Sequence, residues 1–246
     1  PVAVIGVHEE DILMAVEKAC KQEVIKAFLI GDKEFIMDYF QGSLPANMTI
    51  VDEKDDRMIA KKGFDMLLNG KAQVVMKGLI HSDVFLKGLL KHKEELITGK
   101  LLSHVAVAEF RDRFLLISDA GVNIDPDFND KVNIVKNSVK EAHNLGISKP
   151  KVALICPVEK VNAKMKCTLE AAAICKMAER GQLKLEAEIE GPLALDVALL
   201  PEAAKIKKVR AHTSVPGNAD VIILDSLTDG NVTYKSLEVF LDAPRA

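Results

Sequence analysis

The sequence has no tryptophan, and only 4% of its 246 residues are aromatic. Because hydrophobic residues still make up 48% of the chain, we expect a core of valine, isoleucine, leucine and alanine. No uninterrupted apolar run reaches the ~18 residues typical of a membrane-spanning helix. The opening stretch PVAVIGV is typical of a buried strand and not of a charged signal segment, so neither membrane insertion nor export is expected.

An excess of positive charge is also missing, since the formal net charge is −3. This balance argues against a nucleic-acid-binding surface or attachment to an anionic membrane, so any basic site must be local. The cysteines contain no C-x-x-C pair and no zinc-like spacing, which favours a reduced, cytoplasmic protein. These cysteines are Cys20, Cys156, Cys167 and Cys175.

Motifs for common cofactors are missing as well. The six histidines form no H-x-x-x-H pair, so no metal site is expected. The chain has no G-x-x-x-x-G-K-[ST] loop, and the early stretch IGVHEE does not match G-x-G-x-x-G. Metal-dependent hydrolysis and hydride transfer from a nicotinamide cofactor are therefore disfavoured.

Short apolar runs alternate with helical patterns along most of the chain. Strands are predicted at residues 2–7, 27–30, 48–51, 74–76, 105–110, 114–118, 152–156, 185–189 and 221–224. Helices are predicted at residues 10–21, 33–40, 55–68, 128–145, 163–180, 194–205 and 233–240, with one more starting at Ser82. This alternation predicts an α/β protein with right-handed crossovers and mostly parallel sheets.

The length suits one large domain or two small ones. A charged, glycine-containing stretch, KHKEELITGK, follows Leu90 and suggests a boundary near Gly99. We therefore expect one α/β domain over residues 1–98 and a second over residues 99–240. The charged turn Arg111-Asp112-Arg113 predicts an antiparallel hairpin just after this boundary.

The stretch VVMKGLIHSDVFLKGLL predicts a strand, a turn and the start of a helix. Lys77 and Gly78 end the strand, Ser82 opens the helix and Lys87 follows one turn later. A helix N-terminus, an accessible backbone at glycine and two lysines would suit a phosphate or a carboxylate. The alternative is an ordinary strand-to-helix turn in which Ser82 only caps the helix.

Polar residues also gather after the strands of the second half of the chain. Because the carboxyl ends of parallel strands share one edge, we expect these residues to converge on a crevice. Each has a simpler interpretation as a turn residue, a helix cap or a helix-start charge. They are Asp119, Asn123, Glu159, Asn162, Asp196, Asp229, Gly230, Asn231 and, one turn later, Lys235.

Along nearly its whole length the chain resembles the phosphate acetyl/butyryltransferase family. The MKGL, TGK-x-LSHVAV and GPLALD forms are more similar to butyryl and branched-chain members than to acetyl members. The resemblance is carried by MKGLIHSDVFLKGLL (76–90), TGKLLSHVAV (98–107), SDAGVNIDPD (118–127), CPVEKVNAKM (156–165), EGPLALDVAL (190–199), GNADVII (217–223) and DGNVTYKSL (229–237).

This resemblance implies transfer of an acyl group between coenzyme A and inorganic phosphate, with the coenzyme A thioester as substrate and no cofactor. It implies two α/β/α domains with a cleft between them, the first rejoined by the C-terminal end, in a homodimer or larger homo-oligomer. The implied catalytic residues are Lys235, Asn231 and Lys77. The implied substrate-binding residues are Gly78, Ser82, Lys87, Asp119, Asn123, Glu159, Asn162, Asp196 and Gly230.

One departure from the family pattern bears on activity. Family members carry a serine–arginine pair after the tyrosine–lysine helix, and no such pair follows Lys235 here. If that segment is truly absent from the protein, a non-catalytic acyl-CoA-binding protein is the alternative. A phosphate acetyltransferase stays open as well. A metal-dependent dehydrogenase of similar build would need clustered metal ligands, which the sequence does not suggest.

Overall fold

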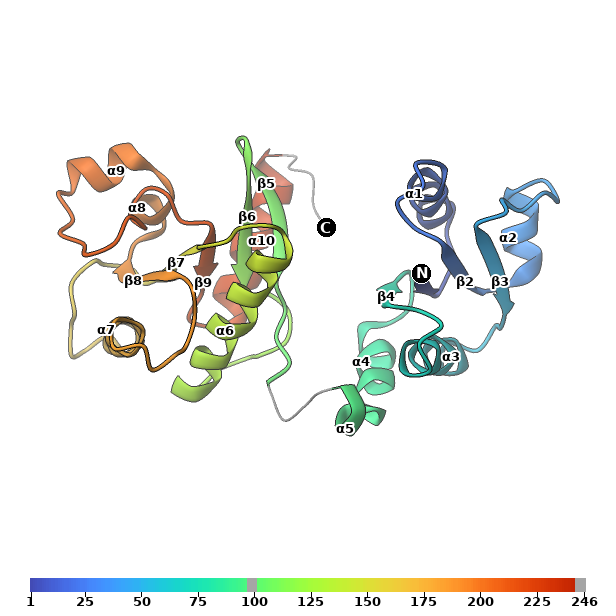
Figure 1. Ribbon diagram of the computed structural model, residues 1–246, viewed down its shortest axis with the longest axis horizontal. Helices are drawn as coiled ribbons and strands as arrows, with labels where there is room; N and C mark the ends of the chain where they lie inside the picture. The colour runs from blue at the N-terminus through green and yellow to red at the C-terminus, as the bar shows by residue number, and fades with distance from the viewer. Residues whose placement is uncertain (97–100, 242–246) are drawn as a thin grey trace. The chain divides into compact units, whose positions relative to one another are not determined.

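The computed structural model describes residues 1–96 and 101–241, and the chain divides into two compact units (Figure 1). Unit 1 is Pro1–Gly99 and unit 2 is Lys100–Ala246. The predicted boundary at residues 98 and 99 lies outside the described residues. The expected cleft between two domains and the return of the C-terminal end to the first domain both stay predictions.

Unit 1 is a four-stranded, all-parallel sheet in the order β3-β2-β1-β4. Its strands are β1 (Val2–Ile5), β2 (Ala27–Gly31), β3 (Met48–Asp52) and β4 (Val74–Lys77). Its helices are α1 (Glu10–Lys21), α2 (Lys33–Tyr39), α3 (Asp56–Leu68), α4 (Ser82–Lys91) and α5 (Lys93–Leu96). The predicted alternation of strands and helices is confirmed.

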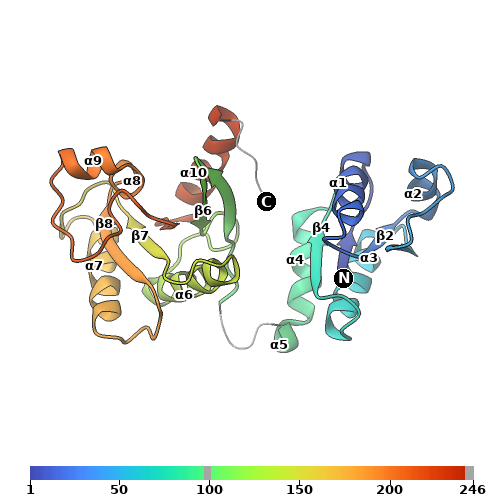
Figure 2. The ribbon, with the colours of Figure 1, turned by 45° about the horizontal axis from the view of Figure 1, so that its top comes forward.

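Both faces of this sheet are covered, because alternate strand residues point to opposite sides. Val4 and Leu29 pack with residues of α1 and α2, whereas Ile5 packs on the other side against α3 and α4. Helices therefore lie on both faces of the sheet (Figure 2). The carboxyl ends of all four strands then meet at one edge.

Unit 2 has five strands in the order β5-β6-β9-β7-β8. β5 pairs antiparallel with β6, which confirms the predicted hairpin, and the other pairs are parallel. Its strands are β5 (Ala106–Phe110), β6 (Arg113–Ser118), β7 (Lys151–Ile155), β8 (Glu188–Leu193) and β9 (Val221–Ile223). Its helices are α6 (Phe128–Asn144), α7 (Lys166–Glu179), α8 (Leu195–Leu199), α9 (Pro201–Ile206) and α10 (Leu227–Leu241).

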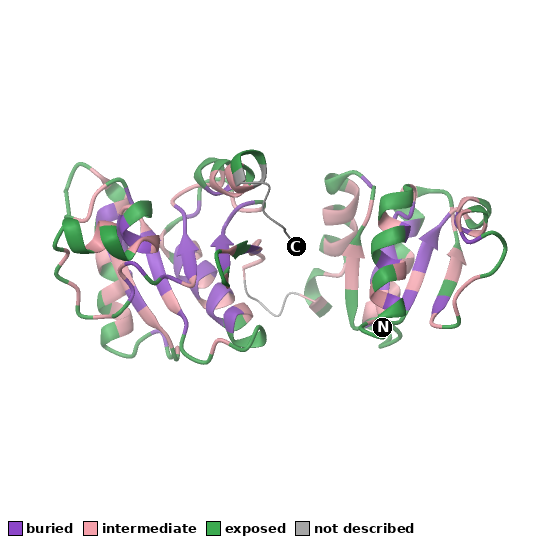
Figure 3. Ribbon diagram, turned by 90° about the horizontal axis from the view of Figure 1, so that it is seen from above, coloured by how far each residue is buried: buried purple, intermediate pink, exposed green. Residues whose placement is uncertain are grey.

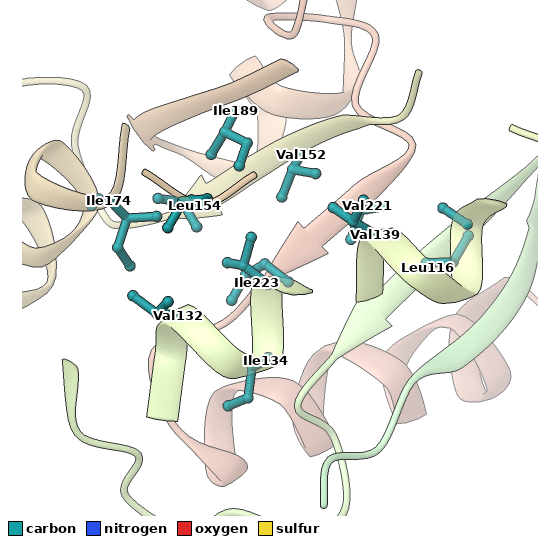
Figure 4. Packing of buried hydrophobic residues seen from close by; sticks show 14 of the residues in the cluster. Leu116, Val132, Ile134, Val139, Val152, Leu154, Ile174, Ile189, Val221 and Ile223 are labelled. Carbon is teal, nitrogen blue, oxygen red and sulfur yellow. The ribbon is translucent and has the colours of Figure 1, made fainter. Parts of the chain in front are cut away.

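The core of unit 2 also lies in two layers, one on each face of the sheet. Val152, Leu154 and Ile223 pack with α6 and α7 (Figure 4). The intervening residues Ala153 and Ile222 pack with α8, α9 and α10. Figure 3 shows buried residues on the central strands of both units, where β1, β2, β7 and β9 are mostly buried, and exposed residues on the outer helix faces. The expected α/β class, with one all-parallel and one mostly parallel sheet, is confirmed.

Helix α7 begins three residues later than the expected start at residue 163. Asn162 forms a turn in which its Oδ1 accepts a hydrogen bond from the Lys164 backbone N–H at 3.0 Å. The Asn162 backbone N–H in turn donates to Thr168 Oγ1 at 2.9 Å. The interpretation of Asn162 as a helix cap is therefore wrong, because the N-cap position belongs to Met165.

The region around Pro192 also differs from expectation, since β8 occupies residues 188–193 and not 185–189. Gly191 and Pro192 suggest the end of a strand, but β8 is an edge strand, where proline is tolerated. Gly191 additionally allows close packing, because an added Cβ would lie 2.7 Å from the Leu154 Cβ.

The predicted helix 194–205 is divided into α8 and α9 at Leu200 and Pro201. Proline fits the first position of a helix, where its missing N–H has no intrahelical acceptor, but it disrupts a helix interior. The break places the end of α9 and the following Lys207 back beside the start of α8.

The last helix, α10, starts at Leu227 and not at the expected Thr233. Ser226 accepts a hydrogen bond from the Asp229 backbone N–H at 3.2 Å and donates its hydroxyl to Asp229 Oδ2 at 2.7 Å. This S-x-x-D arrangement starts the helix. Gly230 and Asn231 therefore lie inside α10, and the interpretation of Asn231 as a helix cap is wrong.

No helix within residues 1–96 and 101–241 combines the length and apolar character needed to cross a bilayer.

Candidate active site

The carboxyl end of β4 brings Lys77 and Gly78 next to the end of β1. The Gly78 backbone N–H donates to the Ile5 carbonyl at 2.7 Å, and an added Cβ would lie 2.5 Å from the Gly6 carbonyl oxygen. Only glycine fits such an approach, so Gly78 serves packing between the two strand ends. Lys77 is exposed, and its Nζ donates to the Gly78 carbonyl at 3.3 Å.

Helix α4 follows this turn and begins at Ser82, whereas the N-cap position belongs to His81. The interpretation of Ser82 as the cap is therefore wrong. Ser82 is exposed in the first turn, where backbone N–H groups have no intrahelical acceptor. The strand-turn-helix start predicted from the sequence is confirmed.

Lys87 lies one turn further along α4, in a pocket that is rich in positive charge. Its side chain is 73% exposed and pairs with Asp83 at 3.1 Å, which lowers the pKa of that carboxyl group. Arg57 and Lys91 line the same pocket, which has a volume of about 470 Å³. Three cations against one carboxylate make this pocket attractive to an anion.

Asp119 lies at the carboxyl end of β6 and is only 2% exposed. Its Oδ1 accepts the backbone N–H groups of Gly121 and Val122, both at 2.8 Å. Its Oδ2 accepts the backbone N–H of His104 at 3.1 Å and the side-chain amide of Asn123 at 2.6 Å. Asp119 and Asn123 therefore hold the loop after β6 in one shape.

The first turns of α10 pack directly on this loop. Gly230 is buried there and packs so closely that an added Cβ would collide with the Asp119 carbonyl oxygen. Asn231 donates its Nδ2 to the Ala120 carbonyl at 3.3 Å. Lys235 is exposed one turn later. The structure thus brings together four of the expected residues, namely Asp119, Asn123, Gly230 and Asn231.

Glu159 and Asp196 form a second group, joined by a residue that sequence analysis missed. Lys207 Nζ lies 2.9 Å from Glu159 Oε1 and 3.3 Å from Asp196 Oδ1. The hydrogen bond that Lys207 donates to Glu159 raises the pKa of Lys207. Asp196 also accepts the Val197 backbone N–H at 2.9 Å, as expected for a charge in the first turn of a helix.

A pocket of about 480 Å³ opens at the carboxyl ends of β7, β8 and β9; we call it the edge pocket. Ligand sites commonly have this size and place in α/β proteins. Its lining comes from the loops after these strands, the start of α7 and the first turns of α10. The lining residues are Ile155, Cys156, Pro157, Cys167, Ala194, Leu195, Leu224, Asp225, Thr228, Asp229, Val232 and Thr233.

A buried group of charges lies behind one wall of the edge pocket. Lys131 of α6 is 7% exposed, and its Nζ donates to Glu170 Oε2 at 2.7 Å and to Asp225 Oδ1. Burial opposes the charge on Lys131, but the hydrogen bonds to Asp225 and Glu170 outweigh it and raise the pKa of the lysine. Asp225 thereby connects the charged group to the pocket wall.

Among the described residues, no group of three or more histidine, cysteine, aspartate or glutamate side chains is placed to hold a metal ion.

Comparison with known proteins identifies the family. A family model described as "Phosphate acetyl/butaryl transferase" matches residues 50–244. The chain belongs to this family. All twelve candidate site residues, from Lys77 to Lys235, lie within the matched region.

Individual relatives support the assignment. The chain is 42% identical to the phosphate butyryltransferase of Clostridium acetobutylicum, over 98% of this chain and 81% of that protein. It is 35% identical to the phosphate acetyltransferase of Thermotoga maritima, over 97% and 81%. A crystal structure of a branched-chain phosphotransacylase from Enterococcus faecalis V583 matches with a TM-score of 0.82 and 28% identity, over 100% of this chain and 86% of that one.

Several residues of this family member that shape its pockets were missed from the sequence. Lys131 had an available signal, because it shares one helix stripe with Val135 and Ala142, where a lysine is unusual. The S-x-x-D pattern at Ser226 and Asp229 could have placed the start of α10. Arg57 and Lys207 had no such signal, since their partners come from distant positions in the sequence.

Proposed function

We propose that this protein is a phosphate butyryltransferase. A phosphate oxygen attacks the carbonyl carbon of a short or branched acyl-CoA, a C–O bond forms, and the C–S bond breaks. The products are an acyl phosphate and free coenzyme A, whose thiolate takes up a proton. The attack is direct, within a complex of both substrates, and the reaction is reversible.

The likeness to the Clostridium acetobutylicum butyryltransferase over nearly the whole chain carries this proposal. The identity with that enzyme is higher than the identity with the Thermotoga maritima acetyltransferase at similar coverage. The resemblance also covers the loops that follow the strands in both units, where α/β proteins bind their ligands. A phosphate acetyltransferase is the second candidate, because the two activities differ in the acyl group and not in the chemistry.

Phosphate is a hydrated anion, so its attack on a thioester needs cations and N–H groups that replace water. We assign this task to Lys77 and Lys235, both of which are exposed. Lys77 has the Gly78 carbonyl as its acceptor, and a bound phosphate would replace that weak contact. Asn231 uses one amide N–H for Ala120, which leaves its second N–H for the developing oxyanion.

The remaining candidate residues support the substrates in this proposal. Lys87 provides charge for an anionic part of coenzyme A or for phosphate, and Ser82 provides a hydroxyl donor. Gly78 holds the turn after Lys77 against the end of β1. Asp119, Asn123 and Gly230 position the loop and helix that carry Asn231. Glu159 and Asp196 keep Lys207 in place. Asn162 shapes the loop between Glu159 and α7.

We further propose that the enzyme acts in the cytoplasm as a homodimer or larger homo-oligomer. The four free thiols support a reducing compartment. Size-exclusion chromatography with light scattering tests the assembly directly, and a monomer at micromolar concentration would contradict it.

The test of the function is thiol release from acetyl-, butyryl- and isobutyryl-CoA, with and without inorganic phosphate. We expect phosphate-dependent release that is fastest with the four-carbon substrates. Fastest release from acetyl-CoA would favour the acetyltransferase. Binding of butyryl-CoA without release, in the presence of phosphate, would favour the non-catalytic acyl-CoA-binding protein.

A further inference from the structure

The edge pocket differs in the chemistry of its walls from the cation-rich pocket that Arg57, Lys87 and Lys91 line. Aliphatic side chains from four separate segments face it, namely Ile155, Leu195, Leu224 and Val232, together with Pro157. The thiols of Cys156 and Cys167 add further weakly polar surface. These walls suit an uncharged, largely apolar group.

The charges at the edge pocket argue against a free phosphate. Its two ionisable side chains with full charge are both carboxylates, Asp225 and Asp229. The nearest buried cation, Lys131, already pairs with Asp225 and Glu170, so it offers no net positive charge. Because Asp225 is paired with Lys131, an anion entering the pocket would chiefly meet the negative charge of Asp229, which would not repel a neutral thioester.

We propose that the edge pocket binds the acyl end of the acyl-CoA substrate and sets the acyl-chain preference. This inference rests on the proposed function and adds the place of the acyl group to it. Its volume of about 480 Å³ leaves room for a four-carbon or branched acyl group and the adjoining part of the pantetheine arm. The hydroxyl of Thr228, at the pocket edge, is a donor for an amide carbonyl of that arm.

Val232 is the wall residue best suited to alter the pocket without disturbing the core. It lies on α10, is 60% exposed and lines the pocket. A larger side chain here removes pocket volume with little repacking. A single methylene in an apolar pocket changes substrate discrimination by roughly 10- to 200-fold, so added bulk should act strongly on longer chains.

Cys167 provides a chemical reporter of occupancy. It lines the edge pocket and is partly exposed. Burial raises the pKa of Cys20 and of Cys156, and it raises the pKa of Cys175 to about 12. Because the thiolate is the reactive form, these three cysteines should react slowly with a maleimide. Alkylation at Cys167 can therefore be followed by peptide mass spectrometry.

The first experiment measures the rate of N-ethylmaleimide addition to Cys167 in phosphate-free buffer. At a butyryl-CoA concentration ten times its Kd, we expect the rate to fall about tenfold, because only unliganded protein reacts. Inorganic phosphate and 3′,5′-ADP, which carries only the nucleotide end of coenzyme A, should leave the rate unchanged. The Cys167→Ser variant should lose the fast-reacting site.

The second experiment compares Val232→Phe with Val239→Phe, which makes the same change at a 72% exposed position of α10 outside the pocket. We expect Val232→Phe to lower kcat/KM for butyryl- and isobutyryl-CoA by roughly 10-fold or more relative to acetyl-CoA. The Val239→Phe variant should keep the wild-type ratio.

Two results would overturn the inference while leaving the proposed function intact. One is phosphate-dependent turnover of butyryl-CoA without protection of Cys167. The other is an unchanged acyl preference in a folded Val232→Phe variant that still turns over butyryl-CoA. Conversely, protection of Cys167 by butyryl-CoA without any turnover would support the pocket and contradict the proposed transferase activity.

Discussion

A charged pair of unit 1 and a charged pair of unit 2 differ in how deeply they are buried. In unit 1 the charged pair of Lys87 and Asp83 lies on an exposed helix surface, and Arg57 and Lys91 line the same pocket. In unit 2 the Lys131 and Glu170 side chains are 8% and 10% exposed and pair with each other. Exposed cations remain available to a ligand, whereas buried ones are committed to the scaffold. A change at an exposed cation should therefore alter substrate binding, whereas a change at a buried one should alter stability.

The pockets differ in the same sense. The unit 1 pocket is lined by three cations and one carboxylate, and the edge pocket of unit 2 is lined by aliphatic side chains, thiols and two carboxylates. An acyl-CoA has both an anionic nucleotide end and an apolar acyl end. The pocket of unit 1 suits an anionic group, and the edge pocket of unit 2 suits an apolar one.

The largest effect is expected from Lys131→Met, which tests whether the buried charged group stabilises unit 2. The change leaves Glu170 and Asp225 without their buried cation, so we expect a loss of about 3–5 kcal/mol in the free energy of unfolding. Urea denaturation followed by circular dichroism measures it. A variant as stable as the wild type would show that this charged group does not stabilise unit 2. The double variant Lys131→Met with Glu170→Gln should recover part of the loss.

The Lys235→Ala variant tests whether an exposed lysine acts on the phosphate substrate. We expect kcat/KM for phosphate to fall about 100-fold, since one charge-stabilising contact at the reacting group is lost. The urea midpoint should stay unchanged, because Lys235 is exposed. Wild-type kinetics in a folded variant would remove Lys235 from the site. Retention of partial activity in Lys235→Arg would indicate that charge, more than shape, matters there.

Glu188 makes a pH-dependent contribution to the free energy of unfolding. Hydrogen bonds from the Ser214 backbone N–H and hydroxyl, with Lys149 nearby, lower its pKa to about 2. Its pKa in the unfolded chain is higher, about 4.3, so the stabilisation is full above that pH and is lost as the pH falls toward 2. We expect this stabilisation to be about 2 kcal/mol at pH 7.

The matched variant for this prediction is Glu188→Gln. It should lower the free energy of unfolding at pH 7 and flatten its dependence on pH between about 4.5 and 2. Urea titrations at a series of pH values measure the slope. An identical slope in both proteins would mean that other carboxyl groups account for the acid sensitivity.

The fold could be predicted from sequence because strand alternation and helix spacing are local. The errors arose where tertiary contacts decide. Gly230 suggests a turn, yet it lies inside α10 because only glycine fits against the Asp119 carbonyl. Gly191 suggests the end of a strand, yet it continues β8 because Leu154 lies so close. Neither partner is near in sequence, so no local pattern could have revealed these contacts.

The candidate site was only partly predictable for a similar reason. Polar residues after strands indicated the edge of the unit 2 sheet at which the edge pocket opens. Their hydrogen bonds, however, hold the surrounding loops in place, and four of the five donors around Asp119 are backbone N–H groups. The edge pocket consists mostly of aliphatic residues, which a search for polar clusters overlooks. Apolar walls and buried charge partners both require the three-dimensional arrangement.

The smallest effect is expected from Lys87→Ala, and it sharpens the comparison because a matched pair exists in the same unit. Lys61 and Asp65 also form an i,i+4 contact, on α3 at 2.6 Å and with the lysine first, but neither lines the cation-rich pocket. Both Lys87→Ala and Lys61→Ala should leave the urea midpoint almost unchanged, as for most exposed pairs. Only Lys87→Ala should raise KM for butyryl-CoA, by roughly two- to fivefold. Since exposed charges are screened by salt, this difference should shrink as ionic strength rises from 0.01 to 1 M. An equal rise in KM for Lys61→Ala would mean that the general charge of unit 1, and not this pocket, attracts the substrate.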